Sequence, residues 1–214
     1  MKRIAFFLIL IIAINYSSAQ TESSKEGVGS LKGKHSFGFS IGMLNQNEVS
    51  VYSVNVKAEA NFIGGIFYNY WLRDEWALEL SAGVLNAEVF SGVSFLGVEQ
   101  KAATVIPLLA GVRYYPHFIA FEENVRPYIS VLVGAHMGHS SSNKVSLGII
   151  TSTVTKVESV FAARTALGID AFIESWLRIG LCGGYNFGSD FKEAVGTRLN
   201  YSGFELSINF GIIL

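Results

Sequence analysis

The sequence contains little cysteine, little charge and few long hydrophobic runs. One residue in 214, Cys182, is a cysteine, so an intrachain disulfide is excluded. Charged residues make up only 15% of the chain, and the net charge is −1. A chain with this balance has no basic field to attract nucleic acid, which excludes that class of partner.

One long apolar run does occur, at the N-terminus. Lys2 and Arg3 precede eleven apolar residues, 4–14, and Ser17 and Ala19 then supply the small residues of a cleavage site before Gln20. Eleven residues are too few for a membrane-spanning helix, so we interpret residues 1–19 as a secretory signal peptide. No cysteine follows the apolar run as a lipoprotein would require. Residues 20–33 form a polar lead-in, and residues 34–214 form the predicted domain.

After the signal peptide the sequence has no second helical span. The longest uncharged stretch, 127–143, is interrupted by Ser130, Gly134 and His136. Yet half of all residues are hydrophobic and 22 are glycine, a composition that suits a bilayer better than water. The only other structure that satisfies every backbone group inside a membrane is a closed β-barrel.

Strict alternation of apolar with polar or small residues supports a barrel. In 204–214, Phe204, Leu206, Ile208, Phe210 and Ile212 share one parity. That pattern predicts a strand with one apolar face, which we interpret as facing lipid. Eight such strands are predicted, at about 35–44, 59–72, 76–89, 101–115, 126–140, 157–173, 176–188 and 201–214. The predicted fold is therefore all-β, an eight-stranded antiparallel up-and-down transmembrane β-barrel.

The connections between these strands alternate in length. The segments 73–75 and 174–175 are tight turns, and a third connection, 116–125, is longer. Outer-membrane barrels have short periplasmic turns and long exterior loops. We therefore expect both termini in the periplasm and four exterior loops, at 45–58, 90–100, 141–156 and 189–200.

Aromatic residues gather at the strand ends beside the short turns, where they predict a periplasmic girdle at the lipid headgroups. These are Tyr70, Trp71, Trp76, Tyr114, Tyr115, Tyr128, Phe172 and Trp176. A looser second belt is expected at the other end, from Phe90, Phe187, Phe191, Tyr201 and Phe204.

The opposite parity, which would face the lumen, carries charge. Its members are three acids and three bases: Glu79, Arg113, Arg164, Asp170, Arg178 and Glu205. The interior of an eight-stranded barrel is just wide enough to be filled by side chains, and buried charges must pair. We predict an ion-pair network that fills the lumen, with Cys182 as a small filler, in preference to a catalytic set or a water-filled pore.

The stretch 106–116 (IPLLAGVRYYP) followed by 126–138 (RPYISVLVGAHMG) resembles the central hairpin of the small outer-membrane β-barrel family. This is the OmpA/OmpX-like domain of Gram-negative bacteria, especially in its Bacteroidetes-type form, and the resemblance spans about 35–214. It implies a surface protein with a porin-like fold; relatives act in adhesion, host interaction or envelope stability. Family members often end in Phe, whereas this chain ends in Leu214.

Two alternatives remain at this stage. His139 and Ser141 lie two residues apart on one face, like the His-x-Ser arrangement of outer-membrane lipid A deacylases, and Glu158 or Glu88 could orient the histidine. A soluble lipocalin-like barrel would fit the strand count, but only with the apolar parity turned inward.

The sequence thus predicts a non-enzymatic, monomeric protein of the cell outer membrane. Its expected partners are membrane lipids, the outer-membrane assembly machinery and an extracellular partner of the exterior loops. No nucleic acid, metal or other cofactor is expected, because no metal-ligand spacing or nucleotide fingerprint is present.

Overall fold

The computed structural model describes residues 29–47, 49–51, 54–56, 60–94, 97–116, 124–146 and 149–214. The predicted signal peptide, and residues 20–28 of the lead-in, lie outside the described residues. Residues 117–123, which make up most of the connection 116–125, also lie outside the described residues. The described part of the chain contains no helix that is long and apolar enough to cross a membrane.

The described chain is built from strands. They are β1 (His35–Gln46), β2 (Val49–Val51), β3 (Val54–Val56), β4 (Ala60–Arg73), β5 (Trp76–Val84), β6 (Asn86–Ser94), β7 (Gly97–Tyr114), β8 (Val125–Ser146), β9 (Ile149–Glu174), β10 (Leu177–Gly188) and β11 (Gly203–Ile213). β2 and β3 form a small separate ribbon, and all other strands belong to one sheet.

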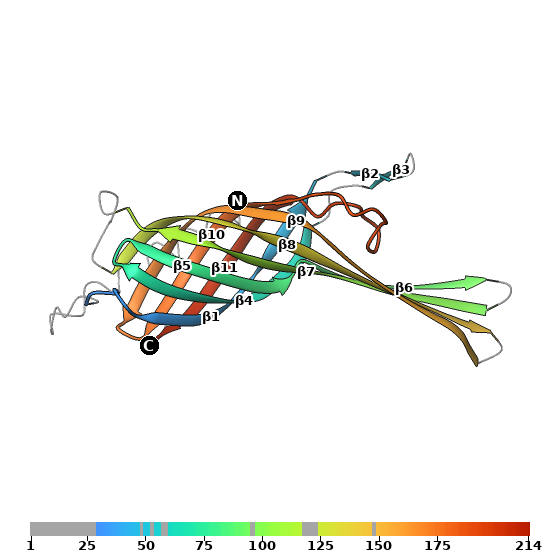
Figure 1. The fold of residues 1–214 in the computed structure, drawn as a ribbon, viewed down its shortest axis with the longest axis horizontal. Coiled ribbons are helices and arrows are strands. Elements are labelled where there is room, and N and C mark those ends of the chain that lie inside the picture. The colour runs from blue at the N-terminus through green and yellow to red at the C-terminus, as the bar shows by residue number, and fades with distance from the viewer. Residues whose placement is uncertain are drawn as a thin grey trace, which may run out of the picture.

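That sheet closes on itself. Every pairing is antiparallel, and the order β5-β4-β1-β11-β10-β9-β8-β7 is completed by pairing of β5 with β7. β6 continues the path of β5 along β7, from Asn86↔Val105 outward. The predicted eight-stranded antiparallel up-and-down barrel is confirmed, and its tilted strands are visible in Figure 1.

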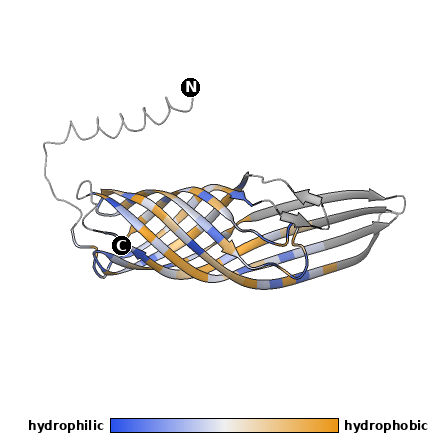
Figure 2. Ribbon diagram, turned by 90° about the horizontal axis from the view of Figure 1, so that it is seen from above, coloured by the Kyte–Doolittle hydropathy of each residue, from blue (hydrophilic) through white to orange (hydrophobic). Residues whose placement is uncertain are grey.

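The two faces of the barrel wall differ as the alternation predicts. In β11, Phe204, Leu206 and Ile208 are exposed, whereas Glu205 and Ser207 between them are buried. Hydropathy also alternates along the other barrel strands, as the banding in Figure 2 shows, and their apolar residues of one parity are the exposed ones. Apolar residues therefore cover the outside of the barrel. This orientation contradicts the lipocalin-like alternative, which needs its apolar parity inside.

Three of the four predicted exterior loops contain strands: β2 and β3 lie within 45–58, and the other two segments are hairpins. Residues 90–94 and 97–100 belong to β6 and β7, and residues 141–146 and 149–156 belong to β8 and β9. These hairpins continue well past the barrel as a projecting sheet, which we call the β6–β9 extension (Figure 1). The polarity of these segments suggested loops, but a strand outside the bilayer can be polar on both faces while its backbone stays paired.

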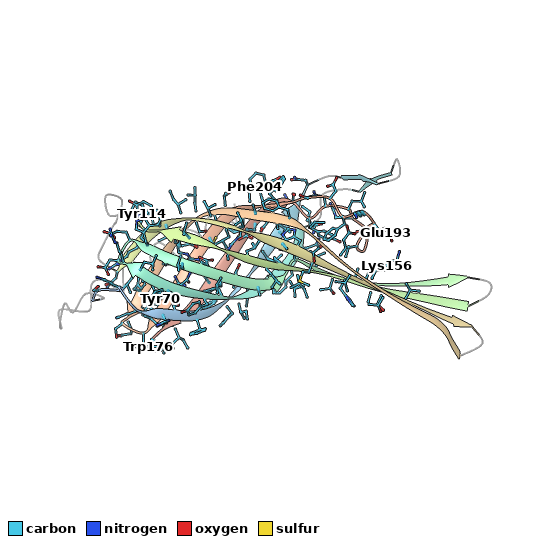
Figure 3. All side chains as sticks on the ribbon, in the orientation of Figure 1. Tyr70, Tyr114, Lys156, Trp176, Glu193 and Phe204 are labelled. Atoms are coloured by element: carbon cyan, nitrogen blue, oxygen red, sulfur yellow. The ribbon has the colours of Figure 1, made fainter. Side chains whose placement is uncertain are left out.

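The predicted periplasmic girdle is half right. Trp76 and Trp176 are exposed on the outer face, and Tyr70, Tyr114 and Trp176 all lie at the end of the barrel that carries the tight turns (Figure 3). We call this the turn end. The other four predicted members point inward and are at most 3% exposed: Trp71, Tyr115, Tyr128 and Phe172. They share the parity of the charged residues, which places them inside the barrel.

The second belt is also mixed. Phe187 and Phe204 are exposed on the outer face, whereas Phe191 and Tyr201 are buried. The side chain of Phe90 lies outside the described part of the structure. Aromatic composition near a strand end therefore does not by itself place a ring at the lipid surface.

Candidate functional site

Arg113 of β7 lies at the centre of the charged layer in the lumen. Its Nε donates to Glu79 Oε2 at 2.7 Å, and its Nη1 donates to Asp170 Oδ2 at 3.0 Å. Arg113 is 2% exposed and Asp170 is fully buried. One guanidinium thus bridges two carboxylates from two other strands, and such paired, hydrogen-bonded geometry makes buried charge tolerable.

Asp170 Oδ2 also accepts from Arg178 Nη1 at 2.9 Å and from the Tyr115 hydroxyl at 2.7 Å. Arg178 Nη2 in turn donates to Asn69 Oδ1 at 2.8 Å. These contacts join β4, β9 and β10 to the residue that follows β7. The carboxylate of Asp170 is therefore held by two cations and a phenol.

Arg164 forms the second part of the layer. Its Nη2 donates to Glu205 Oε1, and Glu205 Oε2 accepts from Asn186 Nδ2. Arg164 Nη1 lies 3.9 Å from Glu79 Oε1, a distance too long for a hydrogen bond. The structure thus brings all six predicted charged residues together, as three acids and three bases with no net charge.

The sequence prediction did not include the neutral members of this layer, namely Asn69, Tyr115 and Asn186. Each has the inward parity of its strand or follows a strand directly, so alternation contained the necessary signal. Only formally charged residues were selected from that face. The layer is therefore larger than the predicted set and reaches the turn end through Tyr115.

At the turn end, aromatic rings and the lead-in close the lumen. Leu31 is fully buried against a cluster that includes Trp71, Tyr128 and Phe172. The guanidinium of Arg113 lies 4.0 Å from the ring centre of Tyr128, a cation–π distance. Charge and aromatic surface are therefore layered directly on each other.

Asp74, in the turn between β4 and β5, holds the lead-in in this position. Its Oδ1 accepts from the backbone N–H of Leu31 at 2.6 Å, from the N–H of Lys32 at 3.2 Å and from Ser30 Oγ at 2.9 Å. Partial burial raises the pKa of Asp74, but these hydrogen bonds outweigh it, so the pKa lies below its ordinary value. We call this contact the lead-in latch.

The opposite half of the lumen contains an apolar cluster. Its buried cluster comprises Leu44, Ile63, Leu85, Ala103, Val105, Phe191, Val195 and Tyr201. Two of these side chains pack directly on the backbone of Gly138 in β8. A Cβ at this position would lie 2.6 Å from Val195 Cγ2 and 2.8 Å from Phe191 Cε1. The lumen is thus not charged throughout, a feature that the sequence prediction missed.

Three members of this cluster belong to 189–202, the connection between β10 and β11. Phe191, Val195 and Tyr201 are 4% exposed or less. Lys192 N–H donates to Glu158 Oε1, and Lys156 forms an exposed ion pair with Glu193 beside the β6–β9 extension (Figure 3). The predicted exterior loop 189–200 is therefore a segment docked on the barrel mouth.

The predicted His139 and Ser141 pair lies on the outer face of β8. His139 is exposed, and its strand partners are Thr104 and Val157. Glu158 pairs in register with Gly138, so it points to the inner face, and it accepts from Lys192. It is therefore on the wrong face to orient His139. The side chain of the other proposed acid, Glu88, is outside the described part of the structure.

His136 is a buried polar residue that the prediction left unassigned. It is fully buried in β8, and neither ring nitrogen has a hydrogen-bond partner among the described residues. Cys182 is a free, buried thiol that accepts from Arg164 Nη2 at 3.3 Å. In the part of the chain that the structure describes, no cluster of three His, Cys, Asp or Glu residues suits a metal ion.

No family model and no curated protein sequence matches this chain. Among solved structures, it is similar to the outer membrane protein OprG from Pseudomonas aeruginosa, with 12% identity, 87% of this chain and 98% of that chain covered, and a TM-score of 0.51. Neisserial surface protein A matches with 10% identity, coverage of 86% and 98%, and a TM-score of 0.49. Ail, the attachment invasion locus protein of Yersinia pestis, matches with 14% identity, coverage of 86% and 99%, and a TM-score of 0.47. At such identities the likeness to OprG extends to the fold: this chain is an eight-stranded up-and-down β-barrel of that kind.

Proposed function

We propose that this chain is a non-enzymatic, monomeric protein of the Gram-negative outer membrane, related to the OmpA/OmpX-like barrels. The observation that carries the proposal is the continuous apolar exterior of the barrel. Side chains such as Ile66, Leu80 and Leu206 are more than half exposed where their strands are paired on both sides. A soluble monomer rarely exposes so large a contiguous apolar surface, whereas a bilayer requires one.

Orientation follows from the two ends. The short turns, the lead-in latch and the C-terminus are at one end, and we assign this end to the periplasm. The β6–β9 extension and segment 189–202 then face the exterior, where they would meet an extracellular partner. The lumen, filled at both levels by buried side chains, is a structural core in this proposal and not a channel.

Membrane location can be tested by fractionation together with gel migration. The protein should sediment with the outer membrane and migrate faster unboiled than boiled, because a closed barrel stays compact in detergent until it is heated. Recovery in the soluble periplasmic fraction would disprove the proposal.

The orientation of the wall can be tested with single cysteines in a Cys182→Ala background. Cysteines at Leu206 and Ile208 should resist a membrane-impermeant maleimide in intact outer membranes and react after detergent extraction. A cysteine at Lys192, which is exposed in segment 189–202 beyond the barrel wall, serves as a positive control for labelling. Rapid labelling of Leu206 and Ile208 in intact membranes would contradict a lipid-facing wall.

A further inference from the structure

A β-bulge lies at the end of the hairpin that joins β4 to β5. Trp71 pairs with Ala77, but the next pair is Arg73↔Trp76, so Leu72 is an extra residue on β4. A bulge of this kind re-aims the side chains that follow it. Residues that face each other across an antiparallel pair point to the same side of the sheet, so Arg73 shares the outer face with Trp76. Without the bulge, Arg73 would have the inward parity of the buried Trp71.

Arg73, Trp76 and Tyr114 form one row on the outer face at the turn end, and we call these three residues the bulge site. Trp76 pairs in register with both Arg73 of β4 and Tyr114 of β7. The ring centroids of Trp76 and Tyr114 lie 4.5 Å apart, and Tyr114 is seen at the turn end in Figure 3. Aromatic side chains at the end of a barrel wall lie at the level of the lipid headgroups. The bulge adds a cation to them at that level.

The polar groups of the bulge site are open to a ligand. The side chains of Arg73 and Trp76 are exposed, and that of Tyr114 is partly exposed. Within the described part of the chain, no hydrogen bond or ion pair joins any of the three side chains to another residue. The planar guanidinium fork matches phosphate oxygens, and an indole N–H and a phenol O–H can each donate to a further oxygen. The chemistry of the site therefore suits a lipid phosphate.

We propose that the bulge site binds the phosphate of an anionic glycerophospholipid in the periplasmic leaflet. This inference rests on the membrane location and the orientation proposed above. The Arg73 guanidinium donates to the phosphate oxygens, with Trp76 and Tyr114 beside it, and the acyl chains extend along the exposed Leu78 and Leu80 of β5.

Charge decides which class of lipid the site selects. A zwitterionic headgroup carries an ammonium group beside its phosphate, and the bulge site has a cation but no carboxylate to receive it. Of the two acids in the adjoining turn, Asp74 holds the lead-in and Glu75 is half-buried. A headgroup whose phosphate carries the only charge is therefore favoured, by about fivefold in affinity for one arginine near the membrane surface.

The second tight turn has a similar backbone and the opposite charge. β9 and β10 also shift register, from Phe172↔Arg178 to Glu174↔Leu177, which leaves Ile173 as an extra residue. Glu174 is exposed there, near the exposed Trp176. A carboxylate repels a lipid phosphate where a guanidinium attracts one, so this turn provides an internal comparison for the bulge site.

Lipid selection can be measured by quenching of tryptophan fluorescence in the full mature chain, refolded in vesicles of phosphatidylcholine mixed with phosphatidylglycerol. One lipid or the other carries brominated acyl chains, which quench a tryptophan that they touch. Trp176→Phe leaves Trp76 as the only lipid-facing tryptophan, and Trp76→Phe leaves Trp176, because Trp71 is buried in the lumen. At low salt we expect phosphatidylglycerol to be favoured about fivefold beside Trp76 and not to be favoured beside Trp176.

Arg73→Gln in the Trp176→Phe background should abolish the preference beside Trp76. Lys32→Gln is the matched control, because it also removes an exposed cation at the turn end, but from the lead-in and not from the outer wall. It should leave the preference unchanged. Raised ionic strength should weaken the preference in the unaltered site. The comparison of Trp76 with Trp176 requires no change at Arg73, so it holds even if Arg73→Gln fails to refold.

Two results would overturn the proposal and leave the membrane location intact. One is strong quenching of Trp76 by both lipids with no preference between them. The other is an equal preference beside Trp76 and Trp176, or an equal loss in Arg73→Gln and Lys32→Gln, because net charge and not the bulge site would then attract the lipid. Absence of quenching by either lipid would contradict the lipid-facing wall itself.

Discussion

The two halves of the lumen are closed in different ways. At the turn end, charged and aromatic side chains from many strands meet in one layer around Arg113 and Asp170. At the other end, an apolar cluster is covered by a single chain segment, 189–202. The first arrangement connects the barrel wall across its interior, so its loss should weaken the whole barrel. The second depends on one docked segment, so its loss should be felt locally.

Removal of Arg113 gives the largest expected effect. Arg113→Ala deprives Glu79 and Asp170 of a shared cation in a buried setting, and we expect a loss of about 3–5 kcal/mol in the free energy of unfolding. Urea unfolding in lipid vesicles, followed by tryptophan fluorescence, measures this.

The control for Arg113 is Lys156→Ala, which removes a cation from an exposed ion pair with Glu193. Such pairs contribute about 0–1 kcal/mol. Equal losses for the two variants would mean that the charged layer does not stabilise the barrel.

Phe191→Ala tests the other half. It removes a buried ring from segment 189–202, and we expect the docking of that segment to weaken by about 3 kcal/mol. Hydrogen exchange at the Val195 amide and proteolysis within 189–202 should both accelerate, while the urea midpoint changes less than in Arg113→Ala. Phe187→Ala, on the outer face of the adjacent strand, is the control and should leave both local readouts unchanged. Loss of barrel stability equal to that of Arg113→Ala would erase the distinction between the halves.

We expect the burial of His136, in the less polar half of the lumen, to destabilise the folded barrel. Its imidazole is buried, and among the described residues both ring nitrogens lack partners, so His136→Leu should stabilise the barrel by about 1 kcal/mol. The control is His35→Leu, which removes an exposed imidazole that lies 2.7 Å from the Tyr68 hydroxyl and should bring no gain. Destabilisation by His136→Leu would indicate that the imidazole has a partner after all.

The sequence predicted the barrel because alternation is a local signal. Phe204 to Ile212 and the other strands show which side faces outward, and eight such segments with tight turns between some of them leave few alternative architectures. The same parity also identified Glu79, Arg113 and Asp170 as inward residues. Pairing among these side chains depends on the stagger of strands that are distant in sequence, which alternation does not encode.

The wrong predictions arose where a residue was placed by its chemical type. Its parity, meaning its inward or outward position in the alternation along the strand, would have placed it better. Trp71, Tyr115 and Tyr128 were assigned to the lipid surface because they are aromatic and near strand ends, although their inward parity was visible. Residues 141–156 were assigned to a loop because they are polar. Docking of Phe191 and Val195 had no local signal, since a segment without regular alternation gives no indication of what its apolar residues cover.

The lead-in latch should give the smallest effect, and it depends on pH. The pKa of Asp74 is lowered in the folded protein, so its stabilising contribution is complete above the unfolded-state pKa and is lost as the pH falls through the folded-state value. With an ordinary aspartate pKa of about 3.9, the latch should hold at neutral pH and release only below about pH 4. Hydrogen exchange at the Leu31 amide measures the release. Asp74→Asn keeps an acceptor oxygen but cannot titrate, so exchange should be faster than in the wild-type protein at neutral pH and lose this acid dependence. An identical acid profile in Asp74→Asn would mean that a different group controls the latch, and closure of the turn end would then rest on the burial of Leu31 alone.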